Sequence, residues 1–367
     1  MRHAIHALLM LATSFMPELA VPATGSTVAV PTDAVAAPDG AAAMPTDSAA
    51  RLGAAASTPV QPAGTASDGR APLAQLMDQF AALSTRHGWR EEEIYAYADD
   101  ATLRIRAWRT PHHGRALWVL AGIHGEEPAG PNAIARQLAS LVDLARQGVP
   151  IVLIPLCNPK AYRHNWRYPN TPERDWQKGG YSVGDSSYLL PDLETGTKPR
   201  EAAAAGPETR ALTQYVLHKA RDYPPQLVID LHEDELSREG GYIYSQGVHA
   251  DGNPVGAEIV GLLQASGIPL RTSGLTRFGE TIVDGVISRD DKGGPIRDGS
   301  VDELLAAPEV FVDGRMQRGP AGATVVVVET PAFAGSQFER RVSAHAAVVA
   351  RVAELWRLGG QVQRLQP

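Results

Sequence analysis

The sequence has 367 residues, of which 44% are hydrophobic, and its formal net charge is -7 at pH 7. This hydrophobic content is enough to build a sizeable core. The acidic balance and the absence of a concentrated Lys/Arg stripe argue against nucleic acid as a partner. The single cysteine, Cys157, excludes an intramolecular disulfide.

The N-terminus has the pattern of a secretory signal peptide. Arg2 and His3 provide a positive start, residues 4–15 are mostly apolar, and Val21-Pro22-Ala23 places small residues at a cleavage-like position. The apolar run is too short to cross a membrane as a helix. We therefore predict a signal peptide over residues 1–23, no transmembrane segment after its removal, and an exported protein that is periplasmic or extracellular.

Residues 24–70 are mostly Ala, Pro, Thr, Ser, Gly and Asp, and no aromatic residue occurs between Phe15 and Phe80. Such a segment cannot bury enough apolar surface to offset the entropy lost on ordering. The composition predicts a disordered spacer, and the folded domain is expected over residues 71–361.

The folded part is expected to begin with a helix near Pro72, because apolar residues recur there at helical spacing and Gly88 is a plausible stop. Alternation over residues 103–107 predicts a half-exposed strand. Near-continuous apolar runs predict buried strands at 116–123, 151–156, 227–231 and 324–328, with helices over 131–147, 206–221 and 338–358. Strands that are apolar on both faces lie inside a sheet covered by helices, so we predict a single α/β domain. The Gly-, Asp- and Arg-rich segment 278–320 is expected to form loops near the site.

The run Gly122-Ile123-His124-Gly125-Glu126-Glu127-Pro128 directly follows one of these apolar strands. An imidazole at His124 and a carboxylate at Glu127 have the spacing to close on one zinc ion. A third ligand is available at His232, which ends another apolar run. Two His and one Glu, with a position left for water, form a common ligand set of catalytic zinc. The sequence therefore predicts one zinc ion per chain.

Catalysis by such a site requires a further carboxylate that takes a proton from water and passes it to the leaving amine. Glu329 is the candidate, because it follows the apolar run Val325–Val328 and partial desolvation there would raise its pKa. The alternative is a strand-end residue that caps the turn before Pro331. Asp230, two residues before His232 on an extended segment, is a candidate partner for that ligand.

These residues give the chain a resemblance to the zinc carboxypeptidase superfamily that includes succinylglutamate desuccinylases and aspartoacylases. The matching pieces are the run at 122–128, Asn158-Pro159, Asp230-Leu231-His232 and Val328-Glu329, in the family's order. The resemblance implies an α/β/α fold with a mixed, mostly eight-stranded sheet and hydrolysis of an amide bond by a zinc-activated water. It places His124, Glu127 and His232 on the zinc ligands and Glu329 on the general base.

The resemblance also implies substrate-binding residues. Arg167, in Asn165-Trp166-Arg167-Tyr168, matches by spacing the arginine that polarises the scissile carbonyl, where a guanidinium can stabilise an oxyanion. The family's Asp-Leu-Asn-Arg stretch is missing, so Arg174 is only a substitute candidate for gripping a substrate carboxylate. Tyr244 is a candidate for the mobile tyrosine of carboxypeptidases, with core packing as the alternative. Alternation predicts one face for Tyr242 and Tyr244.

The sequence thus favours an exported zinc amide hydrolase of the carboxypeptidase type acting on a peptide, with peptidoglycan stem peptides as a natural candidate. One alternative is a deacylase of N-acyl amino acids, and another is an inactive module that binds zinc or cell-wall peptides. The oligomeric state is left open.

Overall fold

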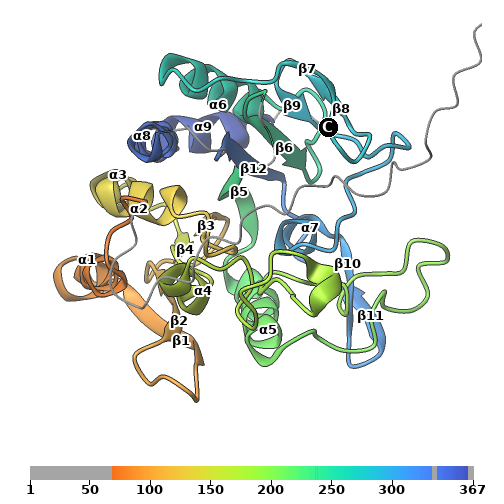
Figure 1. Ribbon diagram of the computed structural model, residues 1–367, viewed down its shortest axis with the longest axis horizontal. Helices are drawn as coiled ribbons and strands as arrows, with labels where there is room; N and C mark the ends of the chain where they lie inside the picture. The colour runs from red at the N-terminus through yellow and green to blue at the C-terminus, as the bar shows by residue number, and fades with distance from the viewer. Residues whose placement is uncertain (1–67, 236, 238, 333–336, 363–367) are drawn as a thin grey trace, which may run out of the picture. The chain divides into compact units, whose positions relative to one another are not determined.

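The computed structural model describes residues 68–235, 237, 239–332 and 337–362, so the expected signal peptide and most of the expected spacer lie outside the described residues. Within the described chain the main element is a mixed sheet of ten strands (Figure 1). In spatial order the strands are β1 (Arg90–Ala96), β2 (Arg104–Arg109), β4 (Ile151–Ile154), β3 (Ala116–Ala121), β5 (Pro225–Asp234), β12 (Thr324–Pro331), β6 (Tyr242–Gln246), β9 (Val286–Ile287), β8 (Thr281–Val283) and β7 (Ser273–Leu275).

The centre of the sheet is parallel. Strands β4, β3, β5 and β12 all run in one direction, whereas β2 and β6 pair antiparallel on either side of them. In the register, Trp118 of β3 lies between Val152 of β4 and Val228 of β5. The carboxyl ends of the central strands therefore open on one edge of the sheet, where ligand sites of such folds are found.

The central strands are apolar on both faces, as their continuous apolar runs predict. Leu117 and Val119 of β3 belong to one hydrophobic core cluster, and Trp118 and Leu120 belong to a second. Because successive side chains of a strand point to opposite faces, these two clusters are the cores on either side of the sheet. Each must be covered, and helices cover both.

The two layers of helices differ in size. Helices packed on the first cluster are α1 (Leu73–His87), α2 (Ala129–Arg136), α3 (Leu138–Arg146), α6 (Pro254–Ala265), α8 (Phe338–Ala350) and α9 (Val352–Val362). The second cluster is covered by α5 (Pro207–Asp222) and α7 (Val301–Ala306), which Figure 1 shows on the other side of the sheet. The remaining elements are α4 (Pro159–His164), a 3-10 turn (Trp176–Lys178) and the separate hairpin of β10 (Glu309–Val312) and β11 (Arg315–Arg318).

Two predicted helices are each divided in two. The helix expected over 131–147 breaks at Gln137, with φ -115° and ψ 22°, and the one expected over 338–358 breaks at Arg351, with φ -102° and ψ 13°. Both residues leave the helical region of the backbone, while the apolar period continues across the break. Periodicity alone therefore could not locate either break.

The predicted α/β class is confirmed, with two corrections. The sheet has ten strands rather than mostly eight. The segment 278–320, expected to form loops, contains β8, β9, α7 and the β10–β11 hairpin. These strands have only two to four residues each, too short for alternation to mark them. Among the described residues, no helix has the length and apolarity needed to cross a membrane.

Candidate metal centre

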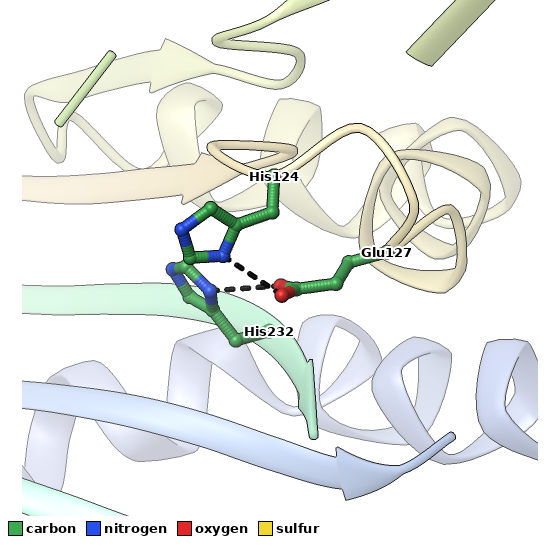
Figure 2. Close-up of side chains that lie close together, drawn as sticks. All are labelled: His124, Glu127 and His232. Carbon is green, nitrogen blue, oxygen red and sulfur yellow. Dashed lines mark hydrogen bonds and ion pairs between the residues drawn. The ribbon is translucent and has the colours of Figure 1, made fainter. Parts of the chain in front are cut away.

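The three predicted metal ligands meet at the carboxyl ends of two neighbouring parallel strands (Figure 2). His124 and Glu127 lie on the loop after β3, and His232 lies near the end of β5. His124 Nδ1 is 2.8 Å from Glu127 Oε1, and His232 Nδ1 is 2.9 Å from Glu127 Oε2. One ligand atom from each of the three residues lies within 4.8 Å of the others.

The loop that carries His124 and Glu127 is held by close packing against α4. A Cβ atom on Gly125 would lie 2.1 Å from the carbonyl carbon of Ala161, so only glycine fits there. Asn158 joins the same two segments. Its Nδ2 donates to Ile123 O at 3.3 Å, and its Oδ1 caps α4 by accepting from Ala161 N at 3.1 Å. Asn158 thus joins the ligand loop to α4, and Asn158-Pro159 forms the start of that helix.

Arg70 is a supporting residue that our sequence analysis missed, because it stands at the end of the expected spacer. Its side chain is almost fully buried, and Nη1 donates to Gly125 O at 2.8 Å and also to Tyr162 O. Its partner Asp68 is the first described residue. The only sequence signal is an Asp-x-Arg directly before the first helix, which is not distinctive.

Both ring nitrogens of His232 face carboxylates. Nδ1 faces Glu127, while Nε2 is 3.4 Å from Asp230 Oδ2, on the side predicted by strand alternation. Asp302, at the start of α7, completes a second buried group with Asp230 and His232. Burial alone would lower the pKa of His232, but Asp230 and Glu127 raise that pKa well above its usual value. Asp302 could not be found from sequence, because it comes from a helix in the segment expected to form loops.

Glu127 is the most enclosed of the three ligands. Its carboxylate also accepts from the backbone N–H of Glu233 at 3.2 Å. Burial would raise its pKa, but His124 and His232 hold the pKa well below the usual value. Glu127 is therefore a carboxylate anion between two imidazoles.

Glu233, the first residue of the acidic run Glu233-Asp234-Glu235 after His232, is buried. Its Oε2 accepts from Ala129 N at 2.7 Å, at the start of α2, and its Oε1 pairs with Arg341 of α8. Glu233 therefore connects the strand carrying His232 to the helix that follows Glu127.

The donor set fits zinc. Two imidazole nitrogens and one carboxylate oxygen are a usual protein set for catalytic zinc, and here they converge around an ionised carboxylate. The contacts of the Glu127 carboxylate with His124 Nδ1 and His232 Nδ1 join the atoms that would hold the ion. His124, Glu127 and His232 are thus the residues that would bind zinc, and Asp230 lies behind a ligand as metal sites commonly require.

Glu329 lies in β12, next to the strand of His232, and the register of the two strands pairs Glu329 with His232. Its side chain is half-buried. Burial raises the pKa of Glu329 to about 8; His232 opposes this shift, and the nearby Glu127 and Asp234 add to it. A bound cation would also oppose it. The structure brings Glu329 to the same edge of the sheet as the three ligands.

Arg167 lies beside the ligand loop. Its Nη1 is 2.8 Å from Glu126 Oε1 and 3.2 Å from Glu127 Oε1. Burial would lower the pKa of Arg167, but these two carboxylates raise it, so the guanidinium stays charged. The positive charge of Arg167 therefore lies next to the carboxylate of Glu127.

Arg174 and Tyr244 are less closely tied to the centre. Arg174 is exposed and pairs with Glu235, three residues beyond His232. Tyr244 is half-buried and its hydroxyl donates to Glu280 at 2.9 Å. Its ring lies 5.5 Å from that of Tyr242, so the two tyrosines share one face as alternation predicts. In the described residues, neither Arg174 nor Tyr244 forms a hydrogen bond or ion pair with a predicted metal ligand.

Comparison with known proteins agrees with this geometry. Residues 113–274 match the family model of the succinylglutamate desuccinylase/aspartoacylase catalytic domain. The matched segment includes His124, Glu127 and His232, whereas Glu329 lies beyond it. A search of curated protein sequences found no match.

Solved structures with the same fold include three proposed metallopeptidases. The one from Shewanella baltica OS155 is 23% identical, with a TM-score of 0.57 over 77% of this chain and 91% of that chain. Those from Shewanella denitrificans OS217 and Shewanella amazonensis SB2B are 19% and 18% identical, with TM-scores of 0.56 and 0.58. They cover 77% of this chain and 90% and 92% of their own. Residues 113–274 are thus similar to the succinylglutamate desuccinylase/aspartoacylase catalytic domain, and the chain shares the fold of these three structures.

Proposed function

We propose that this protein is an exported, zinc-dependent amide hydrolase of the carboxypeptidase type. The observation that carries the proposal is the convergence of His124, Glu127, His232 and Glu329 at one edge of the sheet. They come from the ends of three adjacent parallel strands, β3, β5 and β12. Three ligands and a separate carboxylate are the groups that metal-assisted amide hydrolysis requires.

Each residue has a distinct role in this proposal. His124, Glu127 and His232 hold the ion, which when bound supplies a water of lowered pKa and polarises a carbonyl. Glu329 takes the proton of the attacking water and delivers it to the leaving amine. Arg167 donates to the oxygen that becomes negative as the carbonyl is attacked, because its charge already lies beside the ligand loop.

The proposed substrates are peptides outside the cytoplasm, and peptidoglycan stem peptides are the first to test. Tyr244 and Arg174 are the proposed substrate contacts. In the structure Arg174 pairs with Glu235. A substrate carboxylate would have to compete with that pair, so the requirement for a free carboxylate is a separate point to measure.

A second candidate is hydrolysis of an N-acyl amino acid. The observation in its favour is the family match over residues 113–274, which is to the desuccinylase/aspartoacylase catalytic domain. The chemistry at the metal centre would be the same, and the two candidates differ only in what lies on either side of the amide bond.

The first experiment replaces Glu329 by Gln in the zinc-loaded protein. We expect kcat to fall by about 10²–10⁴-fold, because the amide cannot accept the proton, while zinc content stays the same. Glu309→Gln, on the exposed face of β10, is the matched control and should leave both unchanged. An unaltered kcat in the Glu329 variant would show that Glu329 is not the general base. Absence of activity in the wild type and in both variants would favour the inactive binding module.

A substrate panel then separates the two candidate functions. Stem peptides are compared with the same peptides amidated at the C-terminus, and with N-succinyl and N-acetyl amino acids. Cleavage only of peptides with a free carboxylate indicates a carboxypeptidase. Cleavage of the acyl amino acids alone indicates the deacylase.

Export is tested separately, by cell fractionation and N-terminal sequencing of the recovered protein. We expect it outside the cytoplasm and shortened near Ala23. Recovery of uncleaved protein from the cytoplasm would contradict export without affecting the proposed chemistry.

A further inference from the structure

A pocket with a volume of about 950 Å³ lies at the opposite end of the central strands from the candidate metal centre. Its lining includes Arg115, Gln226 and Ala323. These residues stand at the amino ends of β3, β5 and β12, the strands whose carboxyl ends carry the metal ligands and Glu329. The pocket and the candidate metal centre are therefore separated by the length of these strands.

The pocket is basic, although the whole chain is acidic. Arg115, Arg318 and Arg357 line it, and none of its lining residues is Asp or Glu. The chain as a whole carries a net charge of -7, whereas the lining of this pocket has guanidinium groups and no carboxylate. A pocket of this kind has a positive potential that attracts anions.

Two of these arginines have no counter-ion among the residues that the structure describes. Within the described chain, the side chain of Arg318 has no hydrogen-bond or ion-pair partner, and Arg357 uses only Nε, which donates to Ala353 O of its own helix. Many other arginines are paired with a carboxylate, such as Arg109 with Glu92 and Arg200 with Glu303. The guanidinium groups of Arg318 and Arg357 are thus available to a ligand.

The lining also includes polar side chains and one aromatic side chain. Gln226 and His249 are buried and supply an amide and an imidazole. Trp356 precedes Arg357 on α9 and is partly buried. Arg115, Arg318 and Arg357 come from three separate parts of the chain, and the fold brings them to one pocket.

We propose that this pocket binds a ligand bearing at least two phosphate groups. A guanidinium matches a phosphate with two parallel N–H donors, and among the described residues Arg318 and Arg357 each offer one guanidinium without a counter-ion. Two sources share this chemistry: a soluble bisphosphate, and phospholipid headgroups at a membrane surface. The proposal concerns binding at a site away from the metal centre and does not depend on the proposed hydrolysis.

The test measures binding of two probes to the zinc-loaded protein at low ionic strength. The first probe is fructose 1,6-bisphosphate, measured by titration calorimetry, and the second is vesicles of phosphatidylglycerol with phosphatidylcholine vesicles as reference. The pocket variant is Arg318→Gln with Arg357→Gln. The charge-matched control is Arg86→Gln with Arg340→Gln, which removes two exposed arginines outside this pocket. Circular dichroism and zinc content establish that each variant is folded.

We expect wild type and control to bind a probe saturably, and the pocket variant to bind it about tenfold more weakly or less. If the pocket variant loses binding of the bisphosphate, the ligand is a soluble bisphosphate. If it loses binding of phosphatidylglycerol vesicles alone, the ligand is a lipid headgroup. The proposal is overturned if neither probe binds, if the pocket variant binds as well as wild type, or if both variants weaken equally. Equal weakening would mean a general effect of net charge.

Discussion

At the scale of single residues, the candidate centre is defined by what surrounds His232. One ring nitrogen faces the Glu127 carboxylate, and the other faces Asp230, with Asp302 close behind. A carboxylate behind a metal-binding imidazole fixes the orientation and tautomer of the ring and strengthens it as a ligand. The buried acidic residues near His232 are therefore part of the ligand arrangement rather than a solvated surface.

Glu233 gives the first prediction at this scale. Its carboxylate accepts from Ala129 N and pairs with Arg341, and its backbone N–H donates to Glu127. Glu233→Gln keeps the size and the acceptor but removes the charge beside Arg341. We expect zinc affinity to fall about 10–100-fold, because the positions of Glu127 and His232 become less fixed. Competition with a chromophoric chelator measures this.

The control for that experiment is Glu235→Gln, in the same acidic run but paired with the exposed Arg174. It should leave zinc affinity unchanged. If both variants lose affinity equally, the effect is one of overall charge near the site and Glu233 has no special positioning role.

Arg167 gives a second prediction. Replacing it by Ala removes the donor proposed to stabilise the oxyanion, and kcat should fall about 10²–10³-fold. Arg167→Lys keeps the charge but loses the planar pair of donors, so its kcat should lie between those of Ala and wild type. Steady-state kinetics on whichever substrate the panel identifies provides the measurement. A change in KM alone would instead make Arg167 a residue for substrate binding.

At the scale of elements, the ligand loop depends on how closely it approaches α4. Gly125 lies against backbone atoms of Ala161 and Tyr162, which cannot move aside as a flexible side chain would. The buried guanidinium of Arg70 then joins Gly125 O and Tyr162 O. The geometry of His124 and Glu127 is thus set by backbone packing and not only by their own sequence.

Gly125→Ala is expected to destabilise the fold by about 1–3 kcal/mol, because the added methyl group overpacks the contact. It should also weaken zinc binding by displacing His124. The matched control is Gly261→Ala in α6, where an added Cβ meets nothing within 4 Å. That change should stabilise the fold by about 0.5–1 kcal/mol. Chemical denaturation of both variants provides the comparison, and a neutral Gly125→Ala would show that the loop can shift.

At the scale of the whole molecule, one ion-pair network joins the edge of the sheet to the helix that covers it. Glu92 of β1 accepts from Arg109 of β2 at 2.8 Å and from Lys219 and Tyr215 of α5 at 2.9 and 2.8 Å. Burial raises the pKa of Glu92, but these three partners outweigh burial and lower it to about 2. The ionised form is therefore favoured by folding.

The stability of the protein should follow the titration of Glu92. The folded pKa is about 2 and the ordinary value is 4.5, so this stabilisation is complete above pH 4.5 and is lost as pH falls toward 2. Glu92→Gln should lower the free energy of unfolding by about 2–3 kcal/mol at neutral pH, with the difference shrinking in acid.

Chemical denaturation of the wild type and the Glu92 variant across this pH range measures the free energy of unfolding of each. Glu93→Gln is the control, because Glu93 pairs with Arg104 at the surface with half of its side chain exposed. It should change stability by about 0.5 kcal/mol or less. A Glu92 effect that does not depend on pH would mean that packing rather than charge is responsible.

The sequence by itself determined the α/β class, the central strands and the candidate metal-binding residues. Each rests on local information: continuous apolar runs mark β3, β4, β5 and β12, and the chemistry of zinc selects His and Glu near strand ends. The ends of neighbouring parallel strands meet at one edge, so the positions of His124, Glu127, His232 and Glu329 along the chain were enough to predict their convergence.

Only the tertiary structure decided the rest. Asp302, Arg70 and the buried role of Glu233 depend on contacts between segments far apart in the chain, such as Arg70 with Gly125 and Glu233 with Arg341. The breaks at Gln137 and Arg351 and the basic pocket at the amino ends of the strands are equally invisible to a local pattern. The apolar period of a segment predicts which face of a helix or strand is buried. It does not predict which residue of another helix or strand packs against that face.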